Sequence, residues 1–192
     1  RQMCIRDRST TAINLSACLV EKGKKVLAID MDPQGNTTSG FGVDKNGIEN
    51  TLYELLLGEA ETKDTIVKDV VENLDLIPSN INLSGAEIEL VGIDDKEFIL
   101  KGITDKLRRK YDYIILDCPP SLNMLTINAL TAATSVLVPI QCEYYALEGL
   151  SQLIHTIDLV KERLNKRLKM EGVVFTICLL YTSPSPRDKR QS

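Results

Sequence analysis

The stretch Lys25–Gly42, KVLAIDMDPQGNTTSGFG, decides the fold of this chain. It begins with a short apolar run, Val26–Ile29, whose length and β-branched content predict a buried strand. Asp30 and Asp32 follow at the end of that run, and the polar residues 36–39 predict a loop. Two carboxylates at the carboxyl end of a buried strand, followed by hydroxyl side chains, suit a metal–phosphate ligand. The alternative is a strand end with solvated turn residues.

The rest of the chain alternates predicted helices with predicted strands. The strands are continuous apolar runs, which is typical of an α/β protein whose mostly parallel sheet carries helices on both faces. Ligands of such sheets bind at the carboxyl ends of the strands. Helices are expected at 12–22, 51–57, 62–71, 82–91, 96–109, 122–133 and 149–166, and strands at 26–30, 74–78, 113–117, 135–139 and 171–177.

Composition narrows the class of protein. The 192 residues, 43% of them hydrophobic, suffice for one sizeable core, and the net charge of −4 provides no global basic field for nucleic acid. The five cysteines are scattered without a CxxC pair, which favours reduced thiols over a disulfide framework or a zinc site. No apolar run approaches the ~18–20 residues that span a bilayer, and no secretory leader is evident. We therefore expect a soluble cytoplasmic protein.

A second apolar run, Ile114–Leu116, ends in Asp117 and continues as Cys-Pro-Pro-Ser. This is the form of a Walker B element, whose aspartate holds the magnesium shell of a nucleotide. Ser9 and Thr10 open a predicted helix, where hydroxyls serve either as N-caps or as the magnesium ligand of a phosphate-binding loop. Each feature alone has an ordinary structural explanation, but together they predict a nucleotide site.

Three stretches resemble the ParA/Soj group of chromosome- and plasmid-partitioning ATPases, deviant-Walker P-loop NTPases that also include MinD. These are STTAINLSACLVEKGKKVLAIDMDPQGNTTSGFG, YDYIILDCPPSLNMLTINAL and VLVPIQCEYYALEGLSQL, and the resemblance covers Ser9 to Thr176. It implies a P-loop NTPase-like three-layer sandwich that hydrolyses ATP with Mg²⁺ and binds DNA non-specifically as an ATP-dependent homodimer. It also implies stimulation by a ParB-type centromere-binding protein, no membrane partner, and a cytoplasmic, nucleoid-associated location.

The resemblance assigns the metal and catalytic roles to four residues. Asp32 matches the catalytic switch I aspartate that positions or activates the attacking water, and Asp30 supports the magnesium shell. Asp117 matches the Walker B aspartate, and Ser9 takes the place of the P-loop Thr/Ser that coordinates magnesium. The expected metal set is therefore Ser9, Asp32 and Asp117.

Further contacts to the nucleotide follow from the same resemblance. Arg8 stands in place of the lysine that grips the phosphates, and Thr10 is expected on the α-phosphate side. Pro139 and Gln141 lie on the loop after the next strand, where contacts to the switch or the base are expected. The expected cofactor-binding set is Arg8, Ser9, Thr10, Asp30, Asp117, Pro139 and Gln141.

The phosphate-binding loop of the family is missing from residues 3–8. The family has a strand followed by KGGxGK[ST], whereas this chain has MCIRDR and no glycine before Gly23. Without glycine the backbone cannot easily aim successive N–H groups at phosphates. Met3 replaces the lysine that reaches across the dimer, Arg8 replaces the other lysine, and Asp7 adds a negative charge. We expect this chain to bind ATP poorly or not at all.

Both ends thus depart from the family pattern, because after Thr176 the chain runs into CLLYTSPSPRDKRQS, a Ser/Pro-rich basic stretch typical of disorder. We expect three parts. Residues 1–8 are an aberrant segment in place of the first strand and P-loop, and 9–177 form a ParA-type nucleotide-binding domain, truncated at both ends. Residues 178–192 form a disordered tail. The terminal sequences are expected to be foreign to the natural protein.

Several alternatives stay open at this stage. The chain could be a degenerate, non-hydrolysing partner-binding module of the same fold, or a MinD-like cell-division-site ATPase. A Rossmann-type dehydrogenase with Asp30 on a ribose hydroxyl lacks the GxGxxG pattern. Cys118 is more readily a packed thiol than a nucleophile, and His155 a solvent-facing residue. The run Arg163–Lys169 is either a DNA phosphate contact or a solvated helix end.

Overall fold

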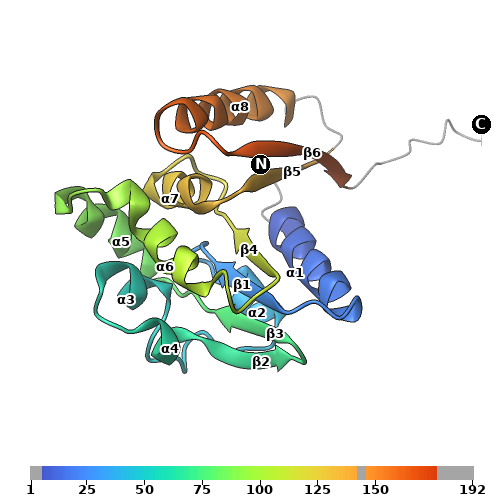
Figure 1. Cartoon of the computed structure of the whole chain (residues 1–192), viewed down its shortest axis with the longest axis vertical. Coiled ribbons are helices and arrows are strands. Elements are labelled where there is room, and N and C mark those ends of the chain that lie inside the picture. The colour runs from blue at the N-terminus through green and yellow to red at the C-terminus, as the bar shows by residue number, and fades with distance from the viewer. Residues whose placement is uncertain (1–5, 142–145, 177–192) are drawn as a thin grey trace, which may run out of the picture.

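The computed structural model describes residues 6–141 and 146–176 (Figure 1). Within these residues there are two sheets, one with the strand order β2-β3-β1-β4 and one that pairs β5 with β6. The strands are β1 (Val26–Asp30), β2 (Val67–Val71), β3 (Leu74–Ile77), β4 (Tyr113–Asp117), β5 (Ser135–Gln141) and β6 (Lys169–Thr176). The helices are α1 (Arg6–Glu21), α2 (Asn36–Gly40), α3 (Leu52–Leu57), α4 (Thr62–Thr65), α5 (Leu83–Glu89), α6 (Ile99–Leu107), α7 (Met124–Ala132) and α8 (Ala146–Arg163), with 3₁₀ turns at Leu90–Gly92 and Lys96–Phe98.

Strand β1 is the buried centre of the larger sheet. It pairs in parallel with β3 on one side and β4 on the other, so that Val26 is in register with both Leu74 and Tyr113. The pairing with β4 ends at Asp30 and Asp117, which are also in register. Because parallel strands bring their carboxyl ends to one edge of the sheet, both acids lie side by side there.

Helices cover both faces of this sheet, as the sequence predicts, and the α/β fold class is confirmed (Figure 1). The side chains of β1 alternate between the faces. Leu27 and Ile29 pack into a core with residues of α3, α5, α6 and α7. Val26 and Ala28 pack on the other face, against a core that includes Leu19 of α1.

A smaller core joins α7 and α8 to the second sheet. Leu130 of α7, Ile157 and Val160 of α8 and Leu168 just before β6 are all buried in it. This packing fixes α8 against α7, so that the α8–β6 turn lies close to the end of α7. Among the described residues, none of the helices has the length and apolar content needed to cross a membrane.

The predicted helix over 62–71 is wrong. Only Thr62–Thr65 is helical, and Val67–Val71 forms β2, which is antiparallel to β3. The short run VKDVV is rich in valine, which favours a strand. Asn73, in the turn between β2 and β3, has a positive φ of 63°. Asp69, inside β2, has a positive φ of 51° and lies where the register with β3 shifts.

Two other boundaries differ from the sequence prediction. The helix expected at 12–22 begins at Arg6, so Arg6, Asp7 and Arg8 are helical rather than part of a loop. The loop predicted at 36–39 forms the short helix α2, which follows Gly35 at φ 61°. The remaining predicted helices and strands are present, with ends shifted by a few residues.

Candidate functional site

Asp117 accepts hydrogen bonds from two hydroxyl groups at the end of β4. Ser9 Oγ, in the first turns of α1, donates to Asp117 Oδ2 at 2.6 Å. Thr37 Oγ1, on α2, donates to the same oxygen at 2.7 Å. All three residues are at most 5% exposed. One carboxylate oxygen therefore connects α1, α2 and β4, which are far apart in the sequence.

Asp30 is bound in the same way by the next residue of α2. Thr38 donates to Asp30 Oδ2 through both its backbone N–H and its Oγ1, each at 2.7 Å. The N–H of Asp32 donates to the other oxygen of Asp30 at 3.2 Å. Thr38 Oγ1 also accepts from the N–H of Ser79 at 3.0 Å, beyond the end of β3. Adjacent threonines of α2 thus contact the terminal acids of two adjacent strands.

Gly35 allows α2 to begin this close to the sheet. Its φ of 61° lies in the left-handed region that favours glycine. A Cβ atom at this position would lie 2.8 Å from the carbonyl oxygen of Ser79. The turn is closed by a 2.9 Å hydrogen bond from the N–H of Gly35 to the carbonyl of Asp32. Glycine is therefore required here both for the backbone angle and for the close approach.

Asp32 lies next to this cluster and is 5% exposed. Its Oδ1 accepts from the N–H of Gln34 at 2.9 Å, which orients the carboxylate. Ser79 Oγ donates to the carbonyl oxygen of Asp32 at 2.7 Å, which fixes its backbone. Asp32 is thus held by its own loop and by the end of β3.

Burial controls the charge of the two strand-end acids. Desolvation raises the pKa of Asp30 to about 6, although hydrogen bonds from Thr38 oppose the rise. Desolvation also raises the pKa of Asp117, and the hydroxyls of Ser9 and Thr37 oppose it. The negative charges of neighbouring acids raise both values further. Two buried acids that resist ionisation would be stabilised in their charged form by a cation.

The structure places Arg8 close to four residues for which metal or catalytic roles are expected: Ser9, Asp30, Asp32 and Asp117. Arg8 is half-buried in α1, and its charge acts on Asp117 to lower the pKa of that carboxyl, against the larger effect of burial. Cys118 is half-buried, and desolvation raises the pKa of its thiol to about 12. At neutral pH that thiol is protonated, which agrees with a packed side chain rather than a nucleophile.

The other expected cofactor-binding residues lie elsewhere. Thr10 is exposed and lines an open cavity of about 460 Å³ between α1 and the second sheet, which Leu137 and Val174 also line. Pro139 lies in β5, in register with Val174. Gln141 is the last residue of β5, and its side chain lies outside the described residues. The nucleotide roles given to these three residues remain predictions.

Thr37, Thr38 and Ser79 are site residues for which the sequence reasoning gave no role. All three are buried, with exposed fractions of 1%, 0% and 0%. The threonines stand in a stretch that was expected to be a polar loop. Ser79 follows the apolar run of β3, so the rule that ligand-binding residues follow strand ends could have identified it from the sequence.

The oxygen atoms gathered around Asp117 suit a hard cation. Mg²⁺ prefers oxygen ligands and is usually held by one or two carboxylates together with phosphates and water. The hydroxyls of Ser9 and Thr37 and the carboxylate of Asp117 are of this type. Within the part of the chain that the structure describes, no group of three or more His, Cys, Asp or Glu side chains could hold a metal ion. The chemistry of Ser9, Thr37 and Asp117 fits a magnesium ion that takes part of its ligands from the protein.

Known proteins resemble this chain over most of its length. An AAA-domain family matches residues 7–170. The sporulation initiation inhibitor protein Soj of Bacillus subtilis is 54% identical over 170 residues, which are 88% of this chain and 67% of that protein. The chromosome partitioning protein ParA of Myxococcus xanthus is 52% identical over 170 residues, which are 88% of this chain and 60% of that protein.

A solved structure agrees with these matches. A cobyrinic acid a,c-diamide synthase from Mycobacterium smegmatis, crystallised with ADP and magnesium, superposes with a TM-score of 0.86 at 39% identity and covers 91% of this chain and 70% of that one. The chain spans 67% of the length of the B. subtilis Soj protein and 60% of that of the M. xanthus ParA protein. With the strand-end acids and the hydroxyls that bind them, these matches show that the chain belongs to the ParA/Soj family of AAA-domain partitioning ATPases.

Proposed function

We propose that this chain is the nucleotide-binding part of a ParA/Soj-type ATPase that acts in chromosome or plasmid partitioning and hydrolyses ATP with Mg²⁺. The observation that carries the proposal is the 2.6 Å hydrogen bond from Ser9 Oγ to Asp117 Oδ2, between the start of α1 and the end of β4. In phosphoryl-transfer enzymes of this class, a P-loop hydroxyl and a Walker B aspartate share one magnesium shell. The ADP and magnesium of the M. smegmatis structure support the same choice of ligand.

Ser9 and Asp117 would hold the magnesium ion, and Thr37 would keep the carboxylate of Asp117 in place. When bound, Mg²⁺ neutralises charge on the phosphate oxygens. Thr37 already donates to Asp117 Oδ2 at 2.7 Å and is 1% exposed, so it orients the acid from the side of α2. Partners that orient a metal ligand in this way commonly change metal affinity by about 10- to 100-fold when removed.

Asp32 is the residue that we assign to the attacking water. Its carboxylate is oriented by the N–H of Gln34 and its backbone by Ser79, so it is held in a fixed position. A fixed carboxylate accepts a proton from water and directs the oxygen towards the γ-phosphorus for in-line attack. Asp30 supports the arrangement through Thr38, which binds both Asp30 and Ser79.

We further propose that nucleotide binding is impaired in this chain. Residues 3–8 lack the glycines and both lysines of KGGxGK. Arg6, Asp7 and Arg8 lie in α1, which supports the absence of a glycine-rich loop at these three positions. If the impairment is complete, the chain is a degenerate module that keeps only partner binding.

The partners and location proposed for the complete protein follow the family. We propose an ATP-dependent homodimer in the cytoplasm that associates with the nucleoid through non-specific DNA binding, and whose hydrolysis is stimulated by a ParB-type protein. The identities to Soj of B. subtilis and to ParA of M. xanthus, 54% and 52%, exceed the 39% identity to the M. smegmatis synthase. A partitioning role is therefore favoured over a synthase reaction.

A comparison of two proteins tests the proposal. One is this chain, and the other is a restored form in which the family's first strand and KGGVGK precede Ser9. Isothermal titration with Mg·ATP should give binding in the restored form and none in this chain. Asp32→Ala in the restored form should keep ATP binding and abolish phosphate release, whereas Asp64→Ala, at an exposed position of α4, should change neither. Unchanged turnover in Asp32→Ala would refute the catalytic assignment, and tight binding by this chain would refute the impairment.

A further inference from the structure

Each of the two sheets has an edge to which no described strand is paired. Among the described residues, β4 pairs only with β1, and β5 pairs only with β6. Helix α7 follows β4 and leads into β5, and a strand–helix–strand connection of this kind joins parallel strands. The unpaired edges of β4 and β5 therefore run in the same direction, as neighbours in one parallel sheet do.

Two helices bridge both sheets from opposite faces. On one face, α1 packs against β4 and also against β5. On the other face, Leu125 and Ala129 of α7 belong to the core of the larger sheet, and Leu130 of the same helix belongs to the core beside the second sheet. The two sheets thus lie in one layer between α1 and α7.

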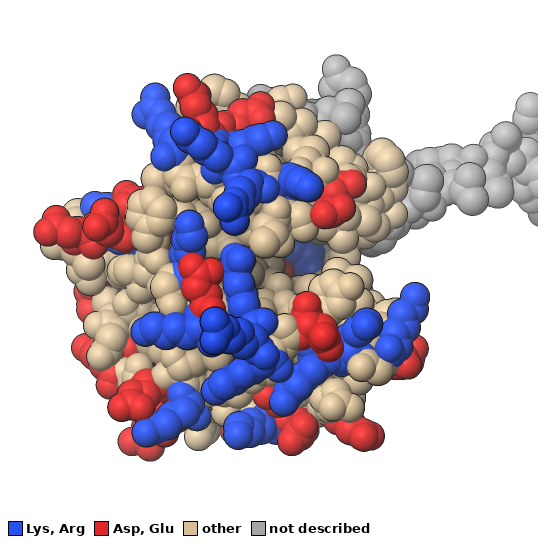
Figure 2. All heavy atoms as spheres, in the orientation of Figure 1, with Lys and Arg blue, Asp and Glu red and all other residues tan. Residues whose placement is uncertain are grey.

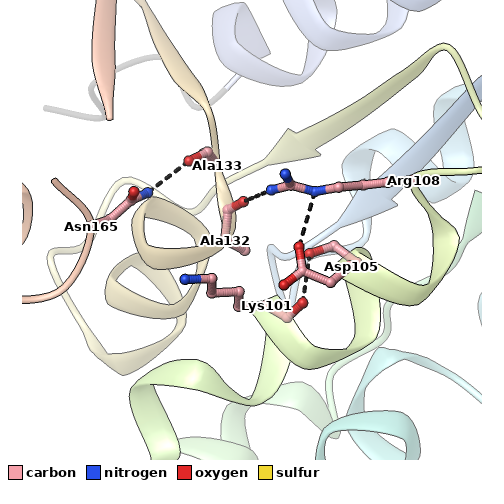
Figure 3. Close-up of polar contacts among 7 residues, drawn as sticks. Lys101, Asp105, Arg108, Ala132, Ala133 and Asn165 are labelled. Carbon is pink, nitrogen blue, oxygen red and sulfur yellow. Dashed lines mark hydrogen bonds and ion pairs between the residues drawn. The ribbon is translucent and has the colours of Figure 1, made fainter. Parts of the chain in front are cut away.

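Hydrogen bonds at the end of α7 fix the two sheets relative to each other (Figure 3). Arg108, in the segment that leads into β4, donates through Nη2 to the carbonyl of Ala132 at 3.2 Å. Asn165, in the segment that leads into β6, donates through Nδ2 to the carbonyls of Ala133 at 2.7 Å and Leu130 at 2.9 Å. One helix end therefore anchors both sheets and sets the separation of their unpaired edges.

The backbone of β4 directs two residues towards its unpaired edge. The N–H of Tyr113 donates to the carbonyl of Lys25 at 3.3 Å, and the carbonyl of Asp117 accepts at 2.8 Å from the loop that follows β1. Both residues therefore face β1. Because successive residues of a strand direct their N–H and C=O groups to opposite sides, Ile114 and Leu116 face away from β1. We call their N–H and C=O groups the open edge of β4.

The open edge lacks a backbone partner within the described chain. The carbonyl of Leu116 has a 3.9 Å contact from Sγ of Cys118, but no described backbone group pairs with Ile114 or Leu116 on this side. Ile114, Ile115 and Leu116 are half-buried, whereas all five residues of β1 are buried. An apolar strand with unpaired backbone groups is a template for another strand.

A cavity adjoins the unpaired edge of β5. It has a volume of about 460 Å³ and lies between α1 and the second sheet. Figure 2 shows a hollow between the part of the molecule that contains α8, β5 and β6 and the part that contains the larger sheet. Leu15 of α1 and Leu137 of β5 line the cavity and are 36% and 39% exposed. Apolar side chains that entered it would remove these leucines from water.

We propose that the open edge of β4 binds an extended apolar segment in trans, as a strand that runs parallel to β4 and β5. A strand covered by helices on both faces is a continuous apolar run. Since β1 and β4 have five residues each, the segment is uncharged, rich in β-branched residues and about five residues long. Its backbone would pair with Ile114 and Leu116, and alternate side chains would enter the cavity.

A parallel strand at this edge would end beside the nucleotide site. Parallel strands bring their carboxyl ends to one edge of a sheet, and at that edge Asp117 accepts a hydrogen bond from Ser9. A glycine-rich loop that continued from the bound strand would lie next to these two residues. This consequence rests on the proposed function, whereas binding of the strand does not.

Amide hydrogen exchange of the whole chain, followed by NMR, tests the proposal with a peptide that carries the sequence IVAVI between lysines. At saturation, the N–H groups of Ile114 and Leu116 should exchange about tenfold more slowly or less, whereas that of Ile115, which faces β1, should change less than about twofold. A control peptide with the sequence IVPVI lacks the central backbone donor. It should bind about tenfold more weakly, because one hydrogen bond is lost.

Substitutions in the cavity test where the side chains of the peptide bind, with fluorescence anisotropy of the labelled IVAVI peptide as the measurement. Leu15→Asp and Leu137→Asp each place a charge in the cavity and should weaken binding by about tenfold. Phe175→Asp is the matched control, because Phe175 is 68% exposed on β6 and does not line the cavity. It should change the affinity less than about twofold. Urea unfolding of each variant confirms that the fold is retained.

Three results would overturn the proposal: no slower exchange at Ile114 and Leu116, equal losses in Leu137→Asp and Phe175→Asp, or peptide binding that occurs only after residues 1–5 are removed. Titration of Mg·ATP in the presence of a peptide in which KGGVGK follows IVAVI separates this inference from the proposed function. Peptide binding without ATP binding upholds the inference and counts against the proposed function. Absence of peptide binding contradicts the inference alone.

Discussion

Asp30 and Asp117 are register partners on the adjacent parallel strands β1 and β4, and each is the last residue of its strand. Both are buried, and burial raises the pKa of each. Two adjacent threonines of α2 each donate a hydrogen bond to one of these acids: Thr37 to Asp117 and Thr38 to Asp30. Burying these two closely spaced acids in their charged form therefore destabilises the native state.

The first prediction concerns pH. The pKa of Asp30 rises from 3.8 to about 6 on folding, so the native state holds this proton more tightly than the unfolded state. Its contribution to stability is present below pH 4 and is lost as pH rises towards 6, by an amount of roughly 3 kcal/mol at most. Asp30→Asn removes the titration. Between pH 4.5 and 6.5, urea unfolding in EDTA should therefore show the wild type losing stability relative to the variant, and parallel curves would contradict the assignment.

The second prediction concerns Thr37, whose hydroxyl orients Asp117. In the restored form with the family's P-loop, Thr37→Ala should weaken Mg·ATP binding by about tenfold, because a support of a metal ligand is lost. Affinity for ATP measured in EDTA should change little. Thr37→Ser keeps the hydroxyl and should recover most of the Mg²⁺-dependent affinity. Equal losses with and without Mg²⁺ would assign Thr37 a purely structural role.

The third prediction concerns Thr38, which is fully buried and donates to Asp30 while it accepts from Ser79. Thr38→Ala leaves the N–H of Ser79 without its partner and removes one donor from Asp30, so the free energy of unfolding should fall by about 2 to 4 kcal/mol. Thr38→Ser should lose only about 1 kcal/mol, for the missing methyl group. Urea denaturation measures both, and equal losses would show that the hydroxyl contributes nothing.

The fourth prediction concerns Asn165, which is 9% exposed and caps the end of α7 from the α8–β6 turn. Asn165→Ala should lower the free energy of unfolding by about 1 to 3 kcal/mol, because two carbonyls lose their donor. Asn165→Asp should lower it more, since a carboxylate cannot donate and is repelled by the negative end of the helix. Thermal unfolding near neutral pH would contradict this account if the two variants were equally stable.

The sequence predicted the sheet centre best. The apolar runs Val26–Asp30 and Tyr113–Asp117 are strands with the predicted bounds, because continuous β-branched runs between polar residues are a strong signal. The range 62–71 was assigned to a helix, although a turn at positive φ and a valine-rich segment make it β2. Short segments of this kind carry too little periodicity to distinguish helix from strand.

The candidate site was predicted through its acids but not through the groups that hold them. Asp30, Asp32, Asp117 and Ser9 lie together as expected. The roles of the hydroxyls on α2 and after β3 depend on strand register and on the left-handed turn that starts α2, which neighbouring residues in the sequence do not encode. Hydroxyl residues after a glycine are also common in ordinary turns. Only the fold shows which of them contact a buried acid.

Ser9 and Thr37 donate to the same oxygen of Asp117, and this shared acceptor makes α1 and α2 energetically dependent on each other. A ligand that draws Asp117 Oδ2 towards itself weakens both hydrogen bonds in one step. We expect a coupling free energy between Ser9 and Thr37, which a double-mutant cycle on their two hydroxyls measures directly. Under the proposed function, this single atom at the end of β4 would link a nucleotide at α1 to α2, which follows the loop that carries Asp32.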